Sequence, residues 1–351
     1  MIIISARSPY QIIINEVGQT GSKVELFIWN KGTTEPTLPT YTMSESIASV
    51  TQTETNYNIS PYILEFINQI APSNVSTPAV ELNTDWCLIK VKRYKLVEKA
   101  ETLLNTIEYV GVNAYTEIPF GLNYDFSEGY YALLANAYRV IQYFNTIPYY
   151  NFLCERSTEL NYSVSYYGAA SNFLGSNTFL TSGATEIYNF KIPLAITNSI
   201  RYVIDDGTND LVEGFTEKLE ECKYSPMTCT FVNKNGGWQY LTFFKAQSNT
   251  INVKGSEYNL LQSSLNYDYR VGQKKSFNIN GSQSVKLNTG FVDENYNELI
   301  KQLLLSDTVL INNNPVTVKT QTLTYKTHLK DKNINFEIEF DYSNNLLNNI
   351  V

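Results

Sequence analysis

The C-terminal part of the chain, from residue 291 onward, constrains the fold more than any other segment. Residues 291–306 read FVDENYNELIKQLLLS and predict an amphipathic helix with Asp293 as its N-cap. The apolar stripe of this helix comprises Tyr296, Leu299, Ile300, Leu303 and Leu304. Residues 315–342 predict two alternating strands around a charged turn. Alternating strands form a sheet with one apolar and one polar face. Such a sheet packed against one helix is typical of a structural part and not of a catalytic site.

Composition extends the β-rich interpretation to the whole chain. Its 351 residues exceed one ordinary hydrophobic core, so two or three domains are expected. The 27 Tyr and 17 Phe residues, with abundant Thr and Asn, favour pleated strands and turns. We therefore predict a mainly β fold, with two or three β-sandwich-like domains and a few short helices.

Three domains follow from the segment patterns. Residues 1–110 predict an N-terminal β-sandwich-like domain, and residues 111–190 a middle β-rich region with an exposed loop. Residues 191–351 predict a C-terminal β domain with one amphipathic helix and a terminal hairpin.

In the first domain, strands are expected at residues 2–4, 11–15, 23–29 and 85–97. Within the third of these, Val24, Leu26 and Ile28 point to one face. A short helix is expected with Ser60 as its N-cap, Pro61 at its first position and an apolar stripe that reaches Ile70.

The middle region gives weaker signals. Turns are expected at residues 109–111 and 118–121, and the small, polar residues 163–183 predict an exposed loop. Residues 129–144 fit helical spacing but are rich in tyrosine, so both a helix and strands stay open.

In the C-terminal domain, the Asn- and Gly-rich residues 233–237 predict a hairpin turn. Strands are expected at residues 201–204, 228–232, 239–244, 267–271, 275–279 and 284–287.

Charge and hydropathy exclude several classes of protein. The net charge is −8 and no Lys/Arg cluster occurs, so a nucleic-acid partner is not expected. Residues 1–15 alternate in polarity and read as a strand, not as a signal peptide. No membrane segment is expected either, because no apolar stretch reaches the length of a transmembrane helix. Synthesis in a cytoplasm is the expectation.

No catalytic, cofactor-binding or metal-binding residue is predicted, and we expect a protein that is not an enzyme. The only histidine, His328, has no nucleophile signature beside it. Asp205, Asp206 and Asp210 surround a glycine but lack a complete calcium loop, which favours a turn. The abundance of carboxylates leaves a glycosidase dyad open, while the acidic pairs 125/128 and 220–221 are expected on the solvated surface.

Cysteines and tryptophans have structural interpretations. The four cysteines are scattered without a CxxC motif, which favours free buried thiols. They are Cys87, Cys154, Cys222 and Cys229. The tryptophans Trp29, Trp86 and Trp238 are expected in a core or a subunit interface, with stacking on sugar rings as the alternative.

Several segments together carry a family resemblance. SPYQIIIN, VELFIWNKG and NISPYILEFI resemble the start of virion proteins of tailed bacteriophages, particularly phages of Bacteroidota hosts. CKYSPMTCTFVNKNGGWQYLTFFK and the C-terminal residues 291–306 and 315–350 are similar to further segments of the same group. Residues 110–200 lie outside the resemblance, and it includes no catalytic motif.

The resemblance implies a structural tail or baseplate protein, located in the virion and assembled in the host cytoplasm. The implied partners are other copies of the chain in a ring and neighbouring virion proteins. A receptor- or glycan-binding module of the particle is the alternative function. The final hairpin is then expected to be a contact edge, because tail-type sheets expose edges that neighbouring subunits complete.

Overall fold

The computed structural model describes most of the chain as two compact units. The described residues are 2–30, 32–49, 51–70, 85–98, 100–121, 131–133, 140–143, 149–154, 161–168, 170–180, 186–191, 201–205, 207–208, 210–218, 223–261, 268, 270–292, 294, 296–324 and 334–348. One unit comprises residues 1–219 and 231–241, and the other comprises residues 220–230 and 242–351. The division into three domains at residues 110 and 190 stays a prediction.

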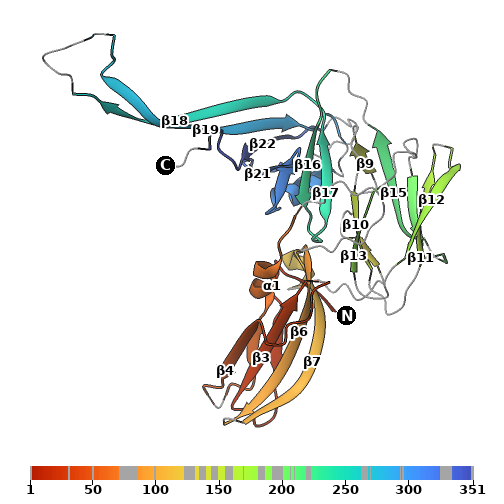
Figure 1. Cartoon of the computed structure of the whole chain (residues 1–351). Helices are drawn as coiled ribbons and strands as arrows, with labels where there is room; N and C mark the ends of the chain where they lie inside the picture. The colour runs from red at the N-terminus through yellow and green to blue at the C-terminus, as the bar shows by residue number, and fades with distance from the viewer. Residues whose placement is uncertain are drawn as a thin grey trace. The chain divides into compact units, whose positions relative to one another are not determined.

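The fold is mainly β, with several separate sheets, as predicted (Figure 1). The described residues form two short α-helices, α1 (Ser60–Phe66) and α2 (Tyr296–Leu304). A single 3-10 turn, η1 (Ile118–Phe120), lies where a turn was predicted.

The first sheet confirms the predicted N-terminal strands. Its strands, in spatial order, are β1 (Ile2–Ser5), β7 (Ala100–Val112), β6 (Trp86–Val97), β3 (Gly21–Trp29) and β4 (Tyr41–Ser46). β2 (Gln11–Ile14) and β5 (Thr55–Asn58) form a separate antiparallel pair. Val24, Leu26 and Ile28 of β3 are buried in one cluster with Ile63 of α1, so the predicted inward face is confirmed. The alternating pattern of β3 therefore reports burial correctly.

The predicted helix cap at Ser60 is wrong. Ile59 is the N-cap residue of α1 and no side chain caps the helix, so Pro61 is the second helical residue and not the first as predicted. Ser60 Oγ instead donates a hydrogen bond to the Ser8 carbonyl oxygen, 2.6 Å away. The helix also ends at Phe66, and Ile70, predicted as part of its apolar stripe, is 61% exposed.

The turn predicted at residues 109–111 is also wrong, because these residues lie inside β7. A Cβ atom on Gly111 would lie 2.5 Å from Ile63 Cγ2 and 2.9 Å from Ile89 Cδ1. The glycine is therefore required by the close packing of helix and strand, not by a turn.

Two sheets occupy the middle of the chain. β13 (Glu186–Lys191), β10 (Tyr149–Cys154) and β8 (Tyr131–Leu133) form one of them. The other contains β12 (Phe173–Leu180), β11 (Asn161–Tyr167), β14 (Arg201–Asp205), β15 (Asp210–Lys218) and β9 (Val140–Tyr143).

These sheets decide two open points. The described parts of residues 129–144 are strands, so the helical alternative fails for them. The loop expected at residues 163–183 is largely the β11–β12 hairpin, and among its described residues only 168 and 170–172 lie outside the two strands. Residues 170–176 and 178 are exposed or half-exposed.

The C-terminal sheet has seven strands in the order β17-β16-β20-β21-β22-β19-β18. They are β16 (Met227–Val232), β17 (Trp238–Phe243), β18 (Ser248–Asn259), β19 (Lys274–Asn288), β20 (Val309–Ile311), β21 (Asn314–Val318) and β22 (Glu337–Tyr342). The hairpin predicted between β16 and β17 is confirmed. Its turn has Gly236 at φ 83°, and Asn233 Oδ1 accepts hydrogen bonds from the Asn235 and Gly237 amides.

Three predictions for this sheet need correction. The final hairpin is not an edge, because β21 lies between β20 and β22, and β22 lies between β21 and β19. The strands expected at residues 275–279 and 284–287 are parts of the single strand β19. The described residues of 267–271 form a turn, in which Asp268 Oδ1 accepts a hydrogen bond from the Arg270 amide. Such a local bond competes with strand pairing.

The predicted stripe of α2 is confirmed. Tyr296, Leu299, Ile300 and Leu303 are buried, and Leu304 is half-buried. The predicted N-cap Asp293 lies outside the described residues.

Candidate interaction surface

Most of the residues considered as catalytic candidates lie outside the part of the chain that the structure describes. His328, Asp206 and the acidic pairs 125/128 and 220–221 lie outside the described residues. Asp205 Oδ1 accepts a hydrogen bond from the Gly207 amide, 3.1 Å away, which is the predicted turn. Within the described part of the chain, no group of three His, Cys, Asp or Glu side chains is placed to hold a metal ion.

Two of the three tryptophans are core residues. Trp86 and Trp238 are each 1% exposed, and Trp29 is half-buried. Trp238 Nε1 donates a hydrogen bond to Oδ2 of the buried Asp85, 2.9 Å away. Trp86 and Trp238 therefore have no face open to a sugar ring.

Cys87 and Cys229 are buried free thiols, as predicted. Burial raises the pKa of the Cys87 thiol to about 12 and raises that of Cys229 as well. The thiolate is the reactive form of cysteine, so neither side chain is suited to nucleophilic or redox chemistry. The side chain of Cys154 and the whole of Cys222 lie outside the described residues.

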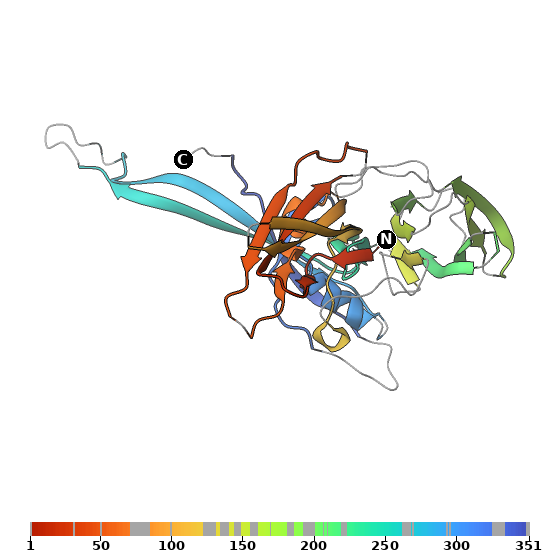
Figure 2. The ribbon, with the colours of Figure 1, turned by 90° about the horizontal axis from the view of Figure 1, so that it is seen from below.

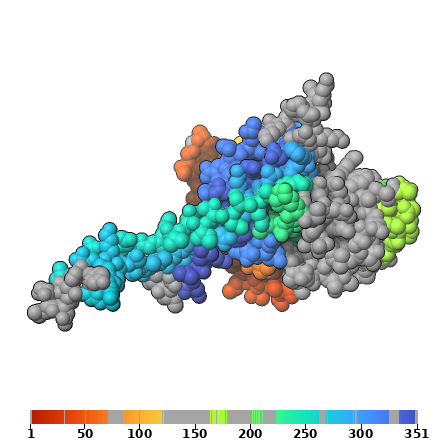
Figure 3. Space-filling view, turned by 90° about the horizontal axis from the view of Figure 1, so that it is seen from above, coloured from red at the N-terminus to blue at the C-terminus, as the bar shows by residue number. Residues whose placement is uncertain are grey.

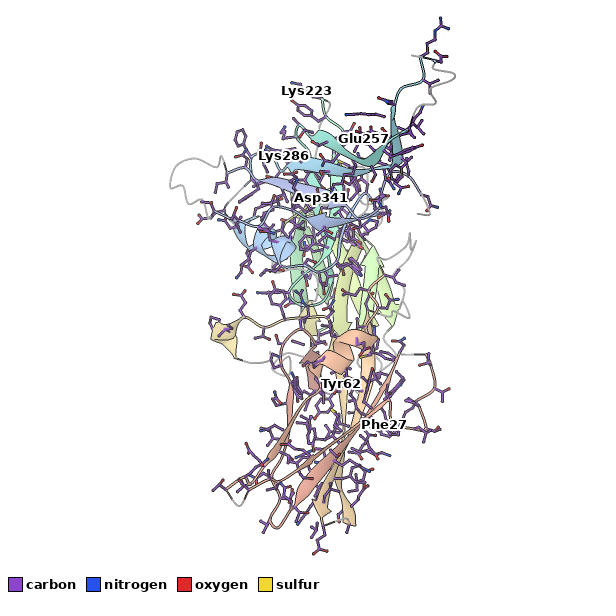
Figure 4. The ribbon with its side chains drawn as sticks, turned by 90° about the vertical axis from the view of Figure 1, so that its left-hand side faces the viewer. Phe27, Tyr62, Lys223, Glu257, Lys286 and Asp341 are labelled. Carbon is purple, nitrogen blue, oxygen red and sulfur yellow. The ribbon has the colours of Figure 1, made fainter. Side chains whose placement is uncertain are left out.

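The most unusual surface of the molecule is the β18–β19 hairpin. Residues 248–281, which we call the arm, extend along the C-terminal sheet and beyond the end of β22 (Figures 1 and 2). In the space-filling view the arm is a narrow ridge of green to cyan and blue atoms (Figure 3). Glu257 lies on this ridge, while Lys286 and Asp341 lie in the sheet from which it extends (Figure 4).

Most described residues of the arm are exposed, and many of them are apolar. Every residue of β18 is exposed. The exposed large apolar side chains of the arm are Ile251, Val253, Tyr258, Leu260, Leu261, Val271, Phe277 and Ile279. Val253 is 66% exposed and Leu261 is fully exposed. A cluster of this kind on one element marks an interaction surface, unlike single scattered apolar residues.

The strand register shows that the core face of the sheet continues onto the arm. Phe340 of β22 is opposite Val285 of β19, and both are fully buried. Val285 is opposite Asn249 of β18, which places Ile251 and Val253 on the same face, two and four residues further along β18. This face is thus covered within the sheet. On the arm, Leu346 of the tail lies over it at Gly281, the residue opposite Val253, while Ile251 and Val253 stay 58% and 66% exposed.

A bulge separates this apolar face from a second one. The register shifts between Lys254 and Ser256, and Asn278 on the opposite strand has φ 51°. Beyond the bulge, the rings of Tyr258 and Phe277 pack edge to face with centroids 5.6 Å apart. Tyr258 is five residues after Val253, so its ring lies on the opposite face of β18.

The edge of β18 is open. β18 is the last strand in its sheet, and within the described residues no strand pairs with its outer side. Backbone N–H and C=O groups on such an edge are available to an incoming strand.

The base of the arm already binds one extended segment, the C-terminal tail (residues 343–348). Pairing of β19 with β22 begins at Ser284. Just before that point, the Leu346 amide donates a hydrogen bond to the Gly281 carbonyl oxygen, 2.8 Å away. Asn280 Nδ2 donates to the Leu347 carbonyl oxygen at 2.9 Å, and Asn280 Oδ1 accepts from the Leu347 amide at 3.1 Å. The arm therefore recognises peptide backbone at its base.

Sequence reasoning missed this surface. It predicted no strand at residues 248–259, although Ile251 and Val253 alternate with Asn252 and Lys254. That alternation was the available signal.

Comparison with known proteins assigns no family. No protein-family model matches the chain, and no curated protein sequence is significantly similar to it. In the part of the chain that the structure describes, no helix has the length and apolar character needed to cross a membrane.

Proposed function

We propose that the chain is a non-enzymatic structural subunit of a tailed-bacteriophage particle, located in the tail or baseplate. There it forms a ring or joins neighbouring virion proteins as an adaptor or hub. The arm is the observation that carries this proposal, because it offers contact surface to another polypeptide and holds no catalytic constellation among its described residues.

Physical chemistry supports an assembly role for the arm. A two-stranded hairpin is marginally stable in water by itself. The arm adds an open edge and two exposed apolar faces, which soluble monomers normally avoid or protect. Such a hairpin gains stability when a partner covers its faces or pairs with its edge. Its Asn, Ser and Lys side chains keep it hydrated until then.

The phage assignment is supported by the sequence resemblance described above. It includes residues 291–306 and 315–350, which contain α2 and most of the neighbouring strands β21 and β22 of the sheet that carries the arm. It also includes β3 and α1 in the other unit.

The alternative of a glycan-binding module has less support. The exposed end of the β11–β12 hairpin carries Phe173 and Leu174. However, Phe173 and Tyr167 pack edge to face at 66°, and the Arg201 guanidinium lies 5.0 Å from the Tyr167 ring centroid. Exposed coplanar aromatic rings would favour stacking on sugars, and these two rings are not coplanar.

Mass spectrometry of purified phage particles tests the proposal. Peptides of this chain should be found in intact particles at a fixed ratio to the other tail proteins. Negative-stain images of the purified full-length protein at high concentration should show particles with rotational symmetry. A protein that stays monomeric and is absent from the particles would overturn the proposal.

A further inference from the structure

We infer that the arm docks on the body of a second copy of this chain, and not on the second copy's arm. Here the body is the whole chain outside residues 248–281. The inference rests on the proposed structural function and names the partner of the same surface.

Charge distinguishes the two possible contacts. The arm contains four basic side chains, Lys254, Arg270, Lys274 and Lys275, and two acidic ones, Glu257 and Asp268. Its net charge is therefore +2, and since the whole chain carries −8, the body carries −10. Two arms side by side would bring like charges together, whereas an arm on a body brings opposite charges together. Charge complementarity of this kind steers association and suppresses wrong pairings.

The exposed apolar face and the open edge of the arm indicate what kind of surface on the body could bind it. Ile251 and Val253 extend a sheet face that is already apolar at Val285 and Phe340. The β18 edge beside them is open to an extended strand. A partner segment that adds to this edge would place its own side chains beside Ile251 and Val253. At the base of the arm, β19 already binds an extended segment, the tail, through two hydrogen bonds of the Asn280 side chain and one of the Gly281 carbonyl oxygen.

This contact has a consequence for symmetry. Because arm and body are different surfaces, each copy binds one neighbour through its arm and another neighbour through its body. Such head-to-tail interfaces close into rings when the rotation permits, and otherwise continue as filaments. Arm-to-body docking thus generates the ring that the proposed function requires without a second kind of interface.

Photo-cross-linking of the full-length protein tests the partner. A benzoylphenylalanine at Tyr258 is irradiated in an equal mixture of ¹⁴N- and ¹⁵N-labelled protein, and the cross-linked peptides are sequenced. Mixed-isotope cross-links from the arm to body peptides are expected. Cross-links only between arms, or none in samples that are oligomeric, would refute the inference. In phage particles, cross-links from Tyr258 solely to a different virion protein would refute it too, yet would leave the proposed function standing.

A matched pair of variants tests the surface. Val253→Asp places a charge on the exposed apolar face of the arm, and Asn252→Asp adds the same charge to the opposite face of the same exposed strand. Sedimentation at several protein concentrations should show association weakened by about ten-fold or more for V253D, because a buried unpaired charge is costly, and by much less for N252D. Association should also weaken as salt is raised. Equal association of the two variants, or insensitivity to salt, contradicts arm-to-body docking.

Discussion

Replacement of Phe340 by alanine tests whether the terminal hairpin is an interior part of its sheet. Phe340 is fully buried on β22, between β21 and β19, and its ring packs edge to face on Phe243 with centroids 5.8 Å apart. A buried aromatic side chain removes about 150–250 Å² from water, which corresponds to about 4–6 kcal/mol at roughly 25 cal/mol per Å². Measured Phe→Ala changes in protein cores cost about 3–5 kcal/mol.

Native-state hydrogen exchange is the suitable assay, because it reports opening free energies separately for each unit. A loss of about 3–5 kcal/mol should accelerate exchange of the β19 and β22 amides by roughly 100- to 4000-fold. Amides of β3, in the other unit, should keep their rates. The milder Phe340→Leu variant should give an intermediate acceleration, which keeps the test informative where the alanine variant fails to fold.

Phe277→Ala is the matched control on the arm. Phe277 is 44% exposed and packs on Tyr258, an edge-to-face contact worth about 0.5–1.5 kcal/mol. Removal of the Phe277 ring should leave exchange of the β22 amides unchanged, while exchange of the amides in the arm should change. If Phe340→Ala accelerated β22 exchange by less than about ten-fold, the interior position of this strand would be refuted.

Three further predictions concern the buried side chains of Cys87 and Trp238, and Asn280, which binds the C-terminal tail. The pKa of Cys87 is raised to about 12 from an ordinary value of 9.0, so its stabilising contribution is complete below pH 9 and is lost as the pH rises toward 12. Thermal denaturation of Cys87→Ala should therefore show a shallower alkaline decline, and an equal decline would contradict this. Trp238→Phe removes a donor to the buried Asp85 carboxyl group and should cost about 1.5–3 kcal/mol in urea unfolding. Asp85→Asn should be costly as well, because both carboxylate oxygens accept hydrogen bonds, from Trp238 and from the Ile70 amide, and an asparagine NH2 group would face one of these donors. Asn280→Ala removes both of its hydrogen bonds to the tail and should speed proteolysis there several-fold, whereas Asn252→Ala on exposed β18 should not.

Local signals predicted the parts of the fold whose causes are local. Residues 233–237 form the expected turn because the Asn233 side chain bonds to nearby amides and Gly236 accepts a positive φ. The α2 stripe was likewise predicted, since helical spacing alone gathers its apolar side chains on one face.

Predictions failed where a distant residue decides the local structure. Gly111 carries a turn signal, yet Ile63 and Ile89 require it inside a strand, and neither is near in sequence. Ser60 is a good N-cap residue in isolation, but the Ser8 carbonyl oxygen takes its hydroxyl group. Sequence patterns report intrinsic preferences, and tertiary contacts override them.

The arm failed to be predicted for a different reason, which bears on its function. β3 and β18 both alternate apolar and polar residues. In β3 the alternation is matched by burial, because Val24 and Leu26 are fully covered by the same unit. In β18 Ile251 and Val253 stay 58% and 66% exposed. A half-buried strand pattern that the described chain leaves uncovered is what an intermolecular strand should show, since alternation encodes which side chains are to be covered and not which polypeptide covers them. A second copy of the chain, as inferred above, would complete the burial that the pattern of β18 already encodes.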